Sequence, residues 1–519
     1  MQKKLSLTSI AFLQIYCFLT LILYGLPFFA QCLAQKISFA ALPLVFFLVW
    51  QSLFIIFSIL LSHKFIKLLS IIFVICNALV FYTMIAYHTQ IDKVMFMNLL
   101  QTDSGEISEL LNWKILVCLI GLGIFPAIII KHCTLIISSF HKIIKSIILS
   151  LLSLGLIGGI FHQTSNLFLH RYKYLQDYLP PLNYIQSIAQ VTLEAVIPQP
   201  PLQIISQDIT PVKINNKPNL IVFIMGETTR AANFSLNGYT RPTNEALTPY
   251  LKEITYYPNT QACGTSTAIA VPCIFSVYDR QHFKEGSEAY TENILDIFNK
   301  ADYKVRWFDN DGGCKDVCNR VWYEEPCQSK TCKDDVLLEN LKEKLETVKD
   351  NQLIVLHTRG SHGPSYHLRY DQQDDIYAPI CQDNELWNCT PEELVNVYDN
   401  TIHYVSRFIA KMIDILKSLE DRYNPVLIYT SDHGESLKED GLFLHSASYE
   451  TAPKYQKEVP LLVWLPQNNG YHLKNVCLKN KAQQSRHSHD NIFHSLLGLS
   501  EIKSQHYQKE LDIFAGCRK

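Results

Sequence analysis

Long apolar stretches free of Asp, Glu, Lys and Arg dominate the first third of this 519-residue chain. About 20 such residues can cross the core of a bilayer as a helix, because a helix satisfies its own backbone hydrogen bonds. The stretches are Leu5–Ala34, Ile37–His63, Leu68–Ile91, Ile115–Ile130 and Ser146–His170. The fourth is short, but Asn112 and Trp113 can extend it at the membrane interface. We therefore expect a transmembrane domain with five spans over residues 1–170.

The first stretch has a second interpretation, as a signal peptide that is removed from the mature protein. The apolar core of such a peptide is about 7–15 residues long. The core of Leu5–Ala34 is longer, and four more apolar stretches follow it. We therefore expect this stretch to stay in the membrane.

The distribution of lysines predicts the orientation of the spans. Most lysines lie on one side of the predicted membrane: before the first span, between the second and third, and between the fourth and fifth. These are Lys3, Lys4, Lys64, Lys67, Lys131, Lys142 and Lys145. The short loops on the opposite side carry Lys36 and Lys93. Because lysine-rich loops stay in the cytoplasm, the N-terminus is expected there. Five crossings then place the C-terminal part outside the cytoplasm.

The cysteines agree with an oxidising location for the C-terminal part. Of 15 cysteines, those in or near the apolar stretches can serve as small apolar residues. The soluble part has close pairs, expected to be disulfides: Cys263 with Cys273, Cys314 with Cys318, Cys327 with Cys332, and Cys381 with Cys389. A zinc ribbon built from the second and third pairs is the alternative. Cys477 and Cys517 are candidates for a fifth disulfide.

Two segments connect the membrane part to the rest of the chain. Residues 88–113 form a long loop between the third and fourth spans, on the side of the soluble domain. In it Asn98, Thr102 and Glu106 are four residues apart and share one face if the segment is helical; a solvated helix surface is the simplest interpretation. Residues 171–218 contain tyrosines suited to the membrane interface and prolines suited to a stiff extended linker. We expect the latter segment to be an interfacial connector.

Residues 219–519 alternate short apolar runs with helical patterns. The expected strands are Asn219–Met225, Lys304–Phe308, Leu353–His357, Val426–Thr430 and Leu461–Trp464. The expected helices are Glu292–Asn299, Asp334–Val348 and Glu392–Leu419, the last with an apolar stripe at helical spacing. Strands that alternate with helices predict an α/β domain with a largely parallel sheet covered on both faces.

Polar clusters directly follow three of these strands: Gly226–Arg230, Gly360–Pro364 and Ser431–Glu435, with His445 further on. In such a sheet, ligands bind beyond the carboxyl ends of the strands. The fold should therefore bring together Glu227, His362, Asp432 and His433. Carboxylates and imidazoles are zinc-type ligands. Each cluster alone could be a capped turn, but three at one sheet edge predict a metal site.

A run of hydroxyl residues offers a nucleophile for that site. Cys263–Ala268 contains Thr265, Ser266 and Thr267, and Ala268–Ser276 could begin a helix whose N-terminal amides favour an anionic group. Zinc coordination would lower the pKa of a hydroxyl and orient it. The hydroxyls could instead only cap the helix. Residue chemistry alone does not rank the three.

Longer motifs around these clusters resemble the lipid A phosphoethanolamine transferases, membrane members of the alkaline-phosphatase/sulfatase superfamily. The motifs are Gly226–Ala231 with Phe234–Tyr239, Cys263–Cys273, Ser431–Ser436 followed by Leu444 and His445, and Ser488–Asn491. The resemblance extends along nearly the whole chain. It implies a catalytic domain of the alkaline-phosphatase/sulfatase type.

The resemblance also implies roles for individual residues. The implied zinc ligands are Glu227, Thr267, Asp432 and His433, and Thr267 is also the nucleophile. The positions that hold the phosphoryl group, bind a second metal or assist proton transfer are Lys315, His362 and His445. The loop residues that help bind the phosphoethanolamine headgroup are Asn98, Thr102 and Glu106. Gly312 stands where relatives are expected to have a serine, which puts a hydroxyl contact near Lys315 in doubt.

The implied reaction is a two-step, zinc-dependent transfer. Thr267 attacks the phosphorus of phosphatidylethanolamine and diacylglycerol leaves; lipid A or lipopolysaccharide then accepts the phosphoethanolamine group. Lys315 would offset charge on the transferring oxygens, and His445 would protonate a leaving oxygen. A less negative lipid A would bind cationic peptides such as polymyxin more weakly. The enzyme is expected as a monomer in the bacterial inner membrane, with its catalytic domain in the periplasm.

Several alternatives remain at this point. The acceptor could be a core sugar, Kdo or heptose, and the donor group could be glycerol phosphate. A non-enzymatic membrane sensor or scaffold could keep a metal for structure. A sulfatase would need a Cys/Ser-x-Pro-x-Arg segment, and the nearest run, Cys389–Glu393, lacks the arginine. A net charge of −2 and the lack of a basic tract give no sign of a nucleic-acid partner.

Overall fold

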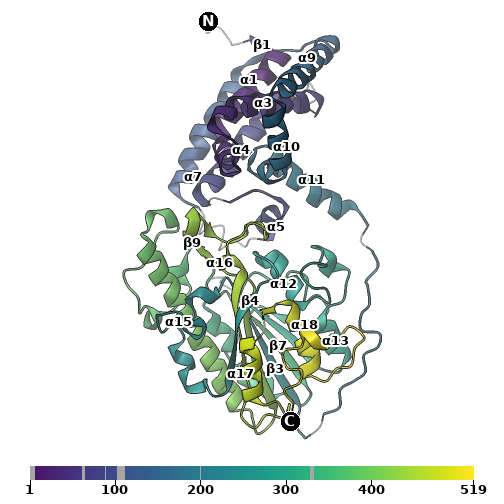
Figure 1. The fold of residues 1–519 in the computed structure, drawn as a ribbon, viewed down its shortest axis with the longest axis vertical. Coiled ribbons are helices and arrows are strands. Elements are labelled where there is room, and N and C mark those ends of the chain that lie inside the picture. The colour runs from purple at the N-terminus through teal and green to yellow at the C-terminus, as the bar shows by residue number, and fades with distance from the viewer. Residues whose placement is uncertain are drawn as a thin grey trace. The chain divides into compact units, whose positions relative to one another are not determined.

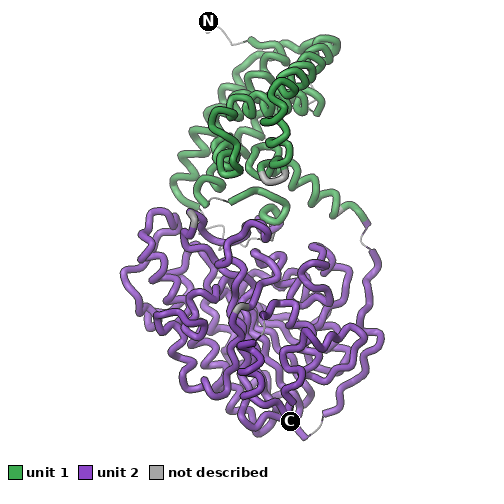
Figure 2. Tube along the Cα trace, viewed as in Figure 1, with its two compact units in different colours: residues 1–96, 111–197 green, residues 97–110, 198–519 purple. Residues whose placement is uncertain are grey.

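The computed structural model describes residues 6–60, 65–87, 89–101, 111–198, 200–214, 216–327, 332–484 and 486–518. The chain forms two compact units (Figure 2). Unit 1 comprises residues 1–96 and 111–197, and unit 2 comprises residues 97–110 and 198–519. Part of the expected periplasmic loop thus groups with the C-terminal unit, and the first part of the expected connector groups with the N-terminal unit.

Unit 1 is built from helices, most of which are apolar (Figure 1). They are α1 (Ser9–Tyr24), α2 (Leu26–Ala34), α3 (Leu42–Leu60), α4 (Ile66–Tyr87), α7 (Trp113–Cys118), α8 (Phe125–His132), α9 (Phe140–Ile160), α10 (His162–Leu175) and α11 (Leu182–Val196). A π-helical turn, Leu119–Ile124, joins α7 to α8. Among the described residues, four continuous helical segments are long and apolar enough to cross a membrane: Phe39–Leu60, Ile66–Tyr87, Trp113–His132 and Phe140–Ile160.

The expected first span is a bent pair of helices rather than one helix. α1 and α2 meet at 65°, so the described part of the unit has four or five candidate spans, depending on whether this pair crosses as one. The bend occurs at Gly25, and Pro27 lies in the first turn of α2. Proline has no N–H group with which to continue the hydrogen bonds of a preceding helix, so a break at this position follows from the sequence.

Much of the expected connector is helical. α10 runs to Leu175, and α11 begins directly after Pro180 and Pro181. Proline is tolerated at the start of a helix, because the N–H groups of the first turn have no partner within the helix. The extended chain begins only after Val196, where three further prolines follow.

Unit 2 contains an eight-stranded sheet in the order β12-β4-β11-β8-β3-β7-β5-β6. The strands are β3 (Asn219–Gly226), β4 (Ile254–Gln261), β5 (Lys304–Asp309), β6 (Trp322–Glu324), β7 (Gln352–His357), β8 (Asn424–Ser431), β11 (Glu458–Trp464) and β12 (His487–Ser488). All five expected strands are present. Most neighbours are parallel, as expected, but β11 runs antiparallel to both β4 and β8. The expectation of a largely parallel sheet is confirmed.

Helices cover both faces of this sheet (Figure 1). In β3, Leu220, Val222 and Ile224 pack with the long helix α15 (Pro391–Lys417). The alternate residues of β3 face a second core formed with α12 (Thr267–Phe275), α13 (Ile294–Lys300), α17 (Asn475–Gln484) and α18 (Asp490–Leu499). Because side chains alternate along a strand, a continuously apolar strand must be buried on both sides.

Local sequence explains where the helices begin and end. Thr390 and Glu393 form a capping box at the start of α15, directly before Pro391. The expected helix over 334–348 is interrupted: a 3-10 turn, Asp334–Leu338, precedes α14 (Leu341–Glu346). Asn340 between them has a φ of 55°, a left-handed conformation that a helix does not contain.

Five disulfides hold the loops of unit 2. They join Cys263 to Cys273, Cys314 to Cys318, Cys327 to Cys332, Cys381 to Cys389, and Cys477 to Cys517. The four expected pairs are confirmed, and the fifth pair, left open by the sequence, also forms. The zinc-ribbon alternative is wrong, since its four sulfurs are consumed in two disulfides. The cysteines of unit 1 remain free thiols.

The disulfides are expected to differ in how much they stabilise unit 2. In the chain-entropy model, the Cys477–Cys517 bridge, with a sequence separation of 40, stabilises by about 4 kcal/mol, against about 2 kcal/mol for Cys314–Cys318, with a separation of 4. Replacing both cysteines of a pair by Ser should lower the free energy of unfolding, and the loss should be larger for Cys477–Cys517 than for Cys314–Cys318. Denaturant titrations followed by tryptophan fluorescence would measure this, and an equal loss in the two double variants would contradict it.

Candidate metal centre and active site

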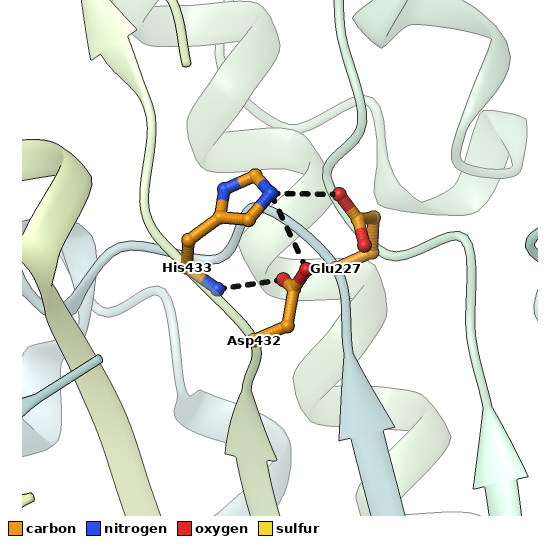
Figure 3. Close-up of side chains that lie close together, drawn as sticks. All are labelled: Glu227, Asp432 and His433. Atoms are coloured by element: carbon orange, nitrogen blue, oxygen red, sulfur yellow. Dashed lines mark hydrogen bonds and ion pairs between the residues drawn. The ribbon is translucent and has the colours of Figure 1, made fainter. Parts of the chain in front are cut away.

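Glu227, Asp432 and His433 converge at the carboxyl ends of two adjacent strands (Figure 3). β3 pairs in parallel with β8, with Gly226 opposite Ser431, so the residues that follow each strand emerge side by side. The Asp432 amide donates to the Gly226 carbonyl at 2.9 Å, and the Thr228 amide donates to Asp432 Oδ1 at 3.2 Å. The sheet register therefore places the carboxylates together, as the sequence predicts.

The distances among four side chains fit a tetrahedral metal. Thr267 Oγ1 lies 3.2 Å from Glu227 Oε1 and 3.4 Å from His433 Nε2. His433 Nε2 lies 3.4 Å from Glu227 Oε1 and 3.3 Å from Asp432 Oδ2. Zinc bonds of about 2.0–2.2 Å arranged tetrahedrally require ligand atoms about 3.3–3.6 Å apart. Four of the six distances among these ligand atoms lie in or near that range, so the cluster is compatible with one tetrahedral zinc ion.

Protonation and charge also fit a cation at this place. The His433 Nδ1 and the Gly434 carbonyl are 2.9 Å apart, which assigns the ring proton to Nδ1 and leaves the Nε2 lone pair directed at the cluster. Burial lowers the pKa of His433 to about 4, so the ring is neutral. Burial, together with the carboxylates of Asp432 and Asp311, raises the pKa of Glu227 well above its usual value. Asp432 Oδ2 has no hydrogen-bond partner among the described residues.

The structure distinguishes the three hydroxyls that the sequence could not rank. Thr265 Oγ1 donates to the Ala447 carbonyl at 2.6 Å, and Ser266, the N-cap residue of α12, is fully buried. Thr267 is the first residue of α12, and its hydroxyl lies among the metal-type ligands. The N-terminal amides of a helix attract an anion such as a phosphate group. Of the three, only Thr267 adjoins both the helix N-terminus and the carboxylate–imidazole cluster.

Three imidazoles form a group beside the cluster. The rings of His433 and His445 are 4.5 Å apart between centroids, and those of His445 and His362 are 5.4 Å apart. His445 Nδ1 lies 3.4 Å from Glu435 Oε2. Burial, and the nearby His445, lower the pKa of His362 well below its usual value. His362, which the sequence placed at this sheet edge, therefore adjoins the metal-type ligands through His445.

Comparison with known proteins identifies the family to which the chain belongs. A Sulfatase family model matches residues 219–502, and a model of phosphoethanolamine transferase EptA/EptB matches residues 49–196. Phosphoethanolamine transferase EptA of Escherichia coli (strain K12) is 36% identical, over 100% of this chain and 98% of that protein. Phosphatidylethanolamine transferase Mcr-1 of Escherichia coli is 30% identical, over 87% of this chain and 86% of that protein.

The likeness holds for the whole structure. The integral membrane protein lipooligosaccharide phosphoethanolamine transferase A (EptA) from Neisseria meningitidis superposes with a TM-score of 0.93 and 32% identity, over 99% of this chain and 100% of that chain. The chain belongs to the phosphoethanolamine transferase family. It is a transferase of the bacterial inner membrane whose C-terminal, sulfatase-like unit lies in the periplasm.

In this transferase Lys315 lies in the segment after β5. Its Nζ donates to the Gly312 carbonyl at 3.1 Å, and its own φ is 50°. A Cβ atom added to Gly312 would meet only Lys315 Nζ, at 4.0 Å, but Gly312 has a φ of 70°, which favours glycine. Space for a serine is therefore present, whereas the backbone conformation disfavours it.

Of the three loop residues, only Asn98 lies within the described part of the transferase. It is on α5 (Lys93–Gln101), and its Nδ2 donates to Ser446 Oγ at 3.1 Å. The Ser446 amide donates to the Thr265 carbonyl at 2.7 Å. Asn98 thus joins the His445–Ser446 segment, which in turn contacts the loop that carries Thr267. Thr102 and Glu106 lie outside the described residues.

The sequence interpretation missed a further group of ligand-type residues in the transferase. Asp309 ends β5, Asp311 follows it, and His357 ends β7 beside Asp309 in the sheet register. Although burial acts to lower the pKa of His357, the adjoining Asp309 carboxylate holds it above its usual value. His357 ends an apolar run, and the sequence pattern therefore predicts only a strand residue there. The signal that could have revealed it is its position opposite Asp309, at the ends of the neighbouring strands β7 and β5.

Proposed function

We propose that this transferase moves phosphoethanolamine from phosphatidylethanolamine to lipid A, with Thr267 as the residue that carries the group between the two lipids. One observation carries the proposal: Thr267 Oγ1, two carboxylates and a neutral imidazole lie together at distances that suit a tetrahedral metal. Zinc held by Glu227, Thr267, Asp432 and His433 would lower the pKa of the hydroxyl and stabilise negative charge on the phosphoryl oxygens.

The residues around Thr267 divide the remaining work of the first half-reaction. The proton of Thr267 Oγ1 passes to solvent water, and the oxygen bonds to phosphorus while the bond from phosphorus to the diacylglycerol oxygen breaks. The amides at the start of α12 and the ammonium group of Lys315 offset the charge that develops on the phosphoryl oxygens. His445, beside His433, donates a proton to the departing oxygen. Asn98, Thr102 and Glu106 orient the headgroup.

In the second half-reaction an acceptor oxygen displaces Thr267 from phosphorus. Among the similar proteins are Phosphatidylethanolamine transferase Mcr-2 of Escherichia coli, 31% identical, and a Kdo(2)-lipid A phosphoethanolamine 7''-transferase, 29% identical over 47% of this chain. The relative named for Kdo(2)-lipid A matches only 47% of this chain, whereas EptA matches its full length, so we take lipid A rather than a core sugar as the acceptor. Each added ethanolamine brings one positive charge, so polymyxin and similar cationic peptides should bind the modified surface more weakly.

Mass spectrometry of lipopolysaccharide tests the proposal. Lipid A from cells that express the protein should gain the mass of phosphoethanolamine, and cells with the Thr267→Ala variant should show none. A gain on Kdo or heptose would move the acceptor to the core sugar, and a gain of glycerol phosphate would replace the donor group. Unchanged lipopolysaccharide from cells with verified protein in the membrane would overturn the proposal.

A further inference from the structure

A second set of metal-type ligands adjoins the first and shares one residue with it. Suitable ligand atoms of Glu227, Asp311 and His357 all lie within 4.8 Å of one another. All three side chains are buried, with exposures of 0% for Glu227, 5% for Asp311 and 0% for His357. Buried carboxylates that meet at one point repel one another, and either a proton on one of them or a cation between them relieves the repulsion.

The hydrogen bonds of Asp309 set the tautomer of His357. Asp309 accepts from Trp307 Nε1 at 2.8 Å and from the amides of Asp311 and Gly313 at 2.9 Å each, so it is an ionised acceptor. His357 Nδ1 lies 2.9 Å from Asp309 Oδ2, which places the ring proton on Nδ1. A carboxylate that holds one ring nitrogen while the other faces a metal is the usual surrounding of a metal-bound histidine.

The other ring nitrogen is directed into the cluster. His357 Nε2 is buried and has no hydrogen-bond partner within the described ranges; Asp311 Oδ2, at 3.7 Å, is beyond hydrogen-bond distance. Burying a polar nitrogen in this way costs free energy unless something binds it. A metal ion between Nε2 and the carboxylates of Asp311 and Glu227 would satisfy it.

The surrounding charges favour a cation. The carboxylates near the position are those of Glu227, Asp432, Asp311 and Asp309, all buried. The opposing cations are Arg359, whose Nε is 3.8 Å from Asp311 Oδ1, and Lys315, which acts on His357 from further away. Asp309 is already held by His357 Nδ1 and Trp307 Nε1, so the charge left for a second cation is that of Asp311 and of Glu227, which both sites share.

We propose that Glu227, Asp311 and His357 form a second site for a divalent cation, with Glu227 shared between the two sites. Two carboxylates and an imidazole suit Zn²⁺ or Mn²⁺. A shared carboxylate is common where two metal ions lie about 3.5–4 Å apart and act on one phosphoryl group. The proposal goes beyond the transfer reaction, since it concerns only what this side-chain cluster binds.

Metal stoichiometry of the full-length protein in detergent tests the second site. The protein is stripped with a chelator, loaded separately with zinc or manganese, freed of unbound metal and analysed by mass spectrometry of the metal. Wild type should retain two equivalents of one of these metals and His357→Gln one. His403→Gln is the matched control, because His403 Nδ1 also pairs with a carboxylate, Asp374, at 3.0 Å. It should retain two.

Other variants separate the alternatives. Asp432→Asn should lose the first equivalent and keep the second. If the second equivalent is absent with both metals, or is lost in His445→Gln and kept in His357→Gln, the proposal is wrong. Should His357→Gln fail to fold, anomalous diffraction from zinc- or manganese-loaded wild-type crystals decides: a peak beside His357 Nε2 supports the site, and none with the first site filled overturns it. These readouts do not depend on the lipid substrate.

Discussion

Thr267→Ala should abolish transfer of phosphoethanolamine, with a loss of at least about 1,000-fold in rate, as expected for removal of a nucleophile. Zinc should still bind through Glu227, Asp432 and His433, though more weakly, because one of four ligand atoms is gone. Thr267→Ser should keep part of the activity, since the hydroxyl survives. Mass spectrometry of lipid A from cells with each variant would measure transfer, and metal analysis would measure binding.

A trapped intermediate would locate the reacting hydroxyl directly. Wild type incubated with phosphatidylethanolamine and no acceptor should gain phosphoethanolamine on the peptide that contains Thr267. Thr265→Val is the matched control: its hydroxyl donates to the Ala447 carbonyl, so the variant should lose about 1 kcal/mol of stability and still transfer. An adduct on Thr265 or Ser266, or transfer by Thr267→Ala, would contradict the mechanism.

Asp432→Asn should lose activity and the zinc of the first site, where the zinc affinity should fall at least about 100-fold. Even residues that only hydrogen-bond to metal ligands change the affinity by about 10- to 100-fold. The amide oxygen can still accept from the Thr228 amide, as Asp432 Oδ1 does at 3.2 Å. The fold should therefore persist. His433→Ala should give the same loss of zinc. Metal analysis and a transfer assay on the same samples would measure both effects.

Thermal unfolding without metal separates a metal ligand from a structural carboxylate. Without a metal, the Asp432 carboxylate repels that of Glu227, which is why it raises the pKa of Glu227. Asp432→Asn removes this repulsion, so the metal-free variant should unfold at the same or a higher temperature than metal-free wild type. Asp374→Asn is the control, because Asp374 accepts from Arg407 Nη2 at 2.6 Å; it should unfold at a lower temperature with its zinc content unchanged. Full zinc content in Asp432→Asn and His433→Ala would mean that the ligand set is wrong.

Continuously apolar strands made the centre of the sheet predictable. β3 and β8 are buried on both faces, and their polar successors, Glu227 and Asp432, could be placed from topology alone. β4 escaped prediction because its sequence is mixed and its pairing with β11 is irregular near Pro258. Proline cannot donate a hydrogen bond to a neighbouring strand, and it weakened the strand pattern.

The sequence predicted only those site residues that directly follow a strand. The choice among Thr265, Ser266 and Thr267 depends on the direction in which each hydroxyl points. A carbonyl distant in the sequence, that of Ala447, holds the Thr265 hydroxyl, whereas the Thr267 hydroxyl lies beside Glu227. The pairing of Asp309 with His357 depends on the register between β5 and β7, which no local pattern encodes. Spacing along the chain predicts which residues share an edge, and packing determines which atoms meet.

The disulfide from Cys263 to Cys273 encloses Thr267 in a covalent loop with a sequence separation of 10. One end of this loop is further held where the Cys263 amide donates to His489 Nδ1 at 3.1 Å. We therefore expect the position of the Thr267 hydroxyl, the proposed nucleophile, to be completed by oxidation, after the chain has left the reducing cytoplasm. We expect such an enzyme to be inactive where it is synthesised and to become active only after export, when this disulfide has formed.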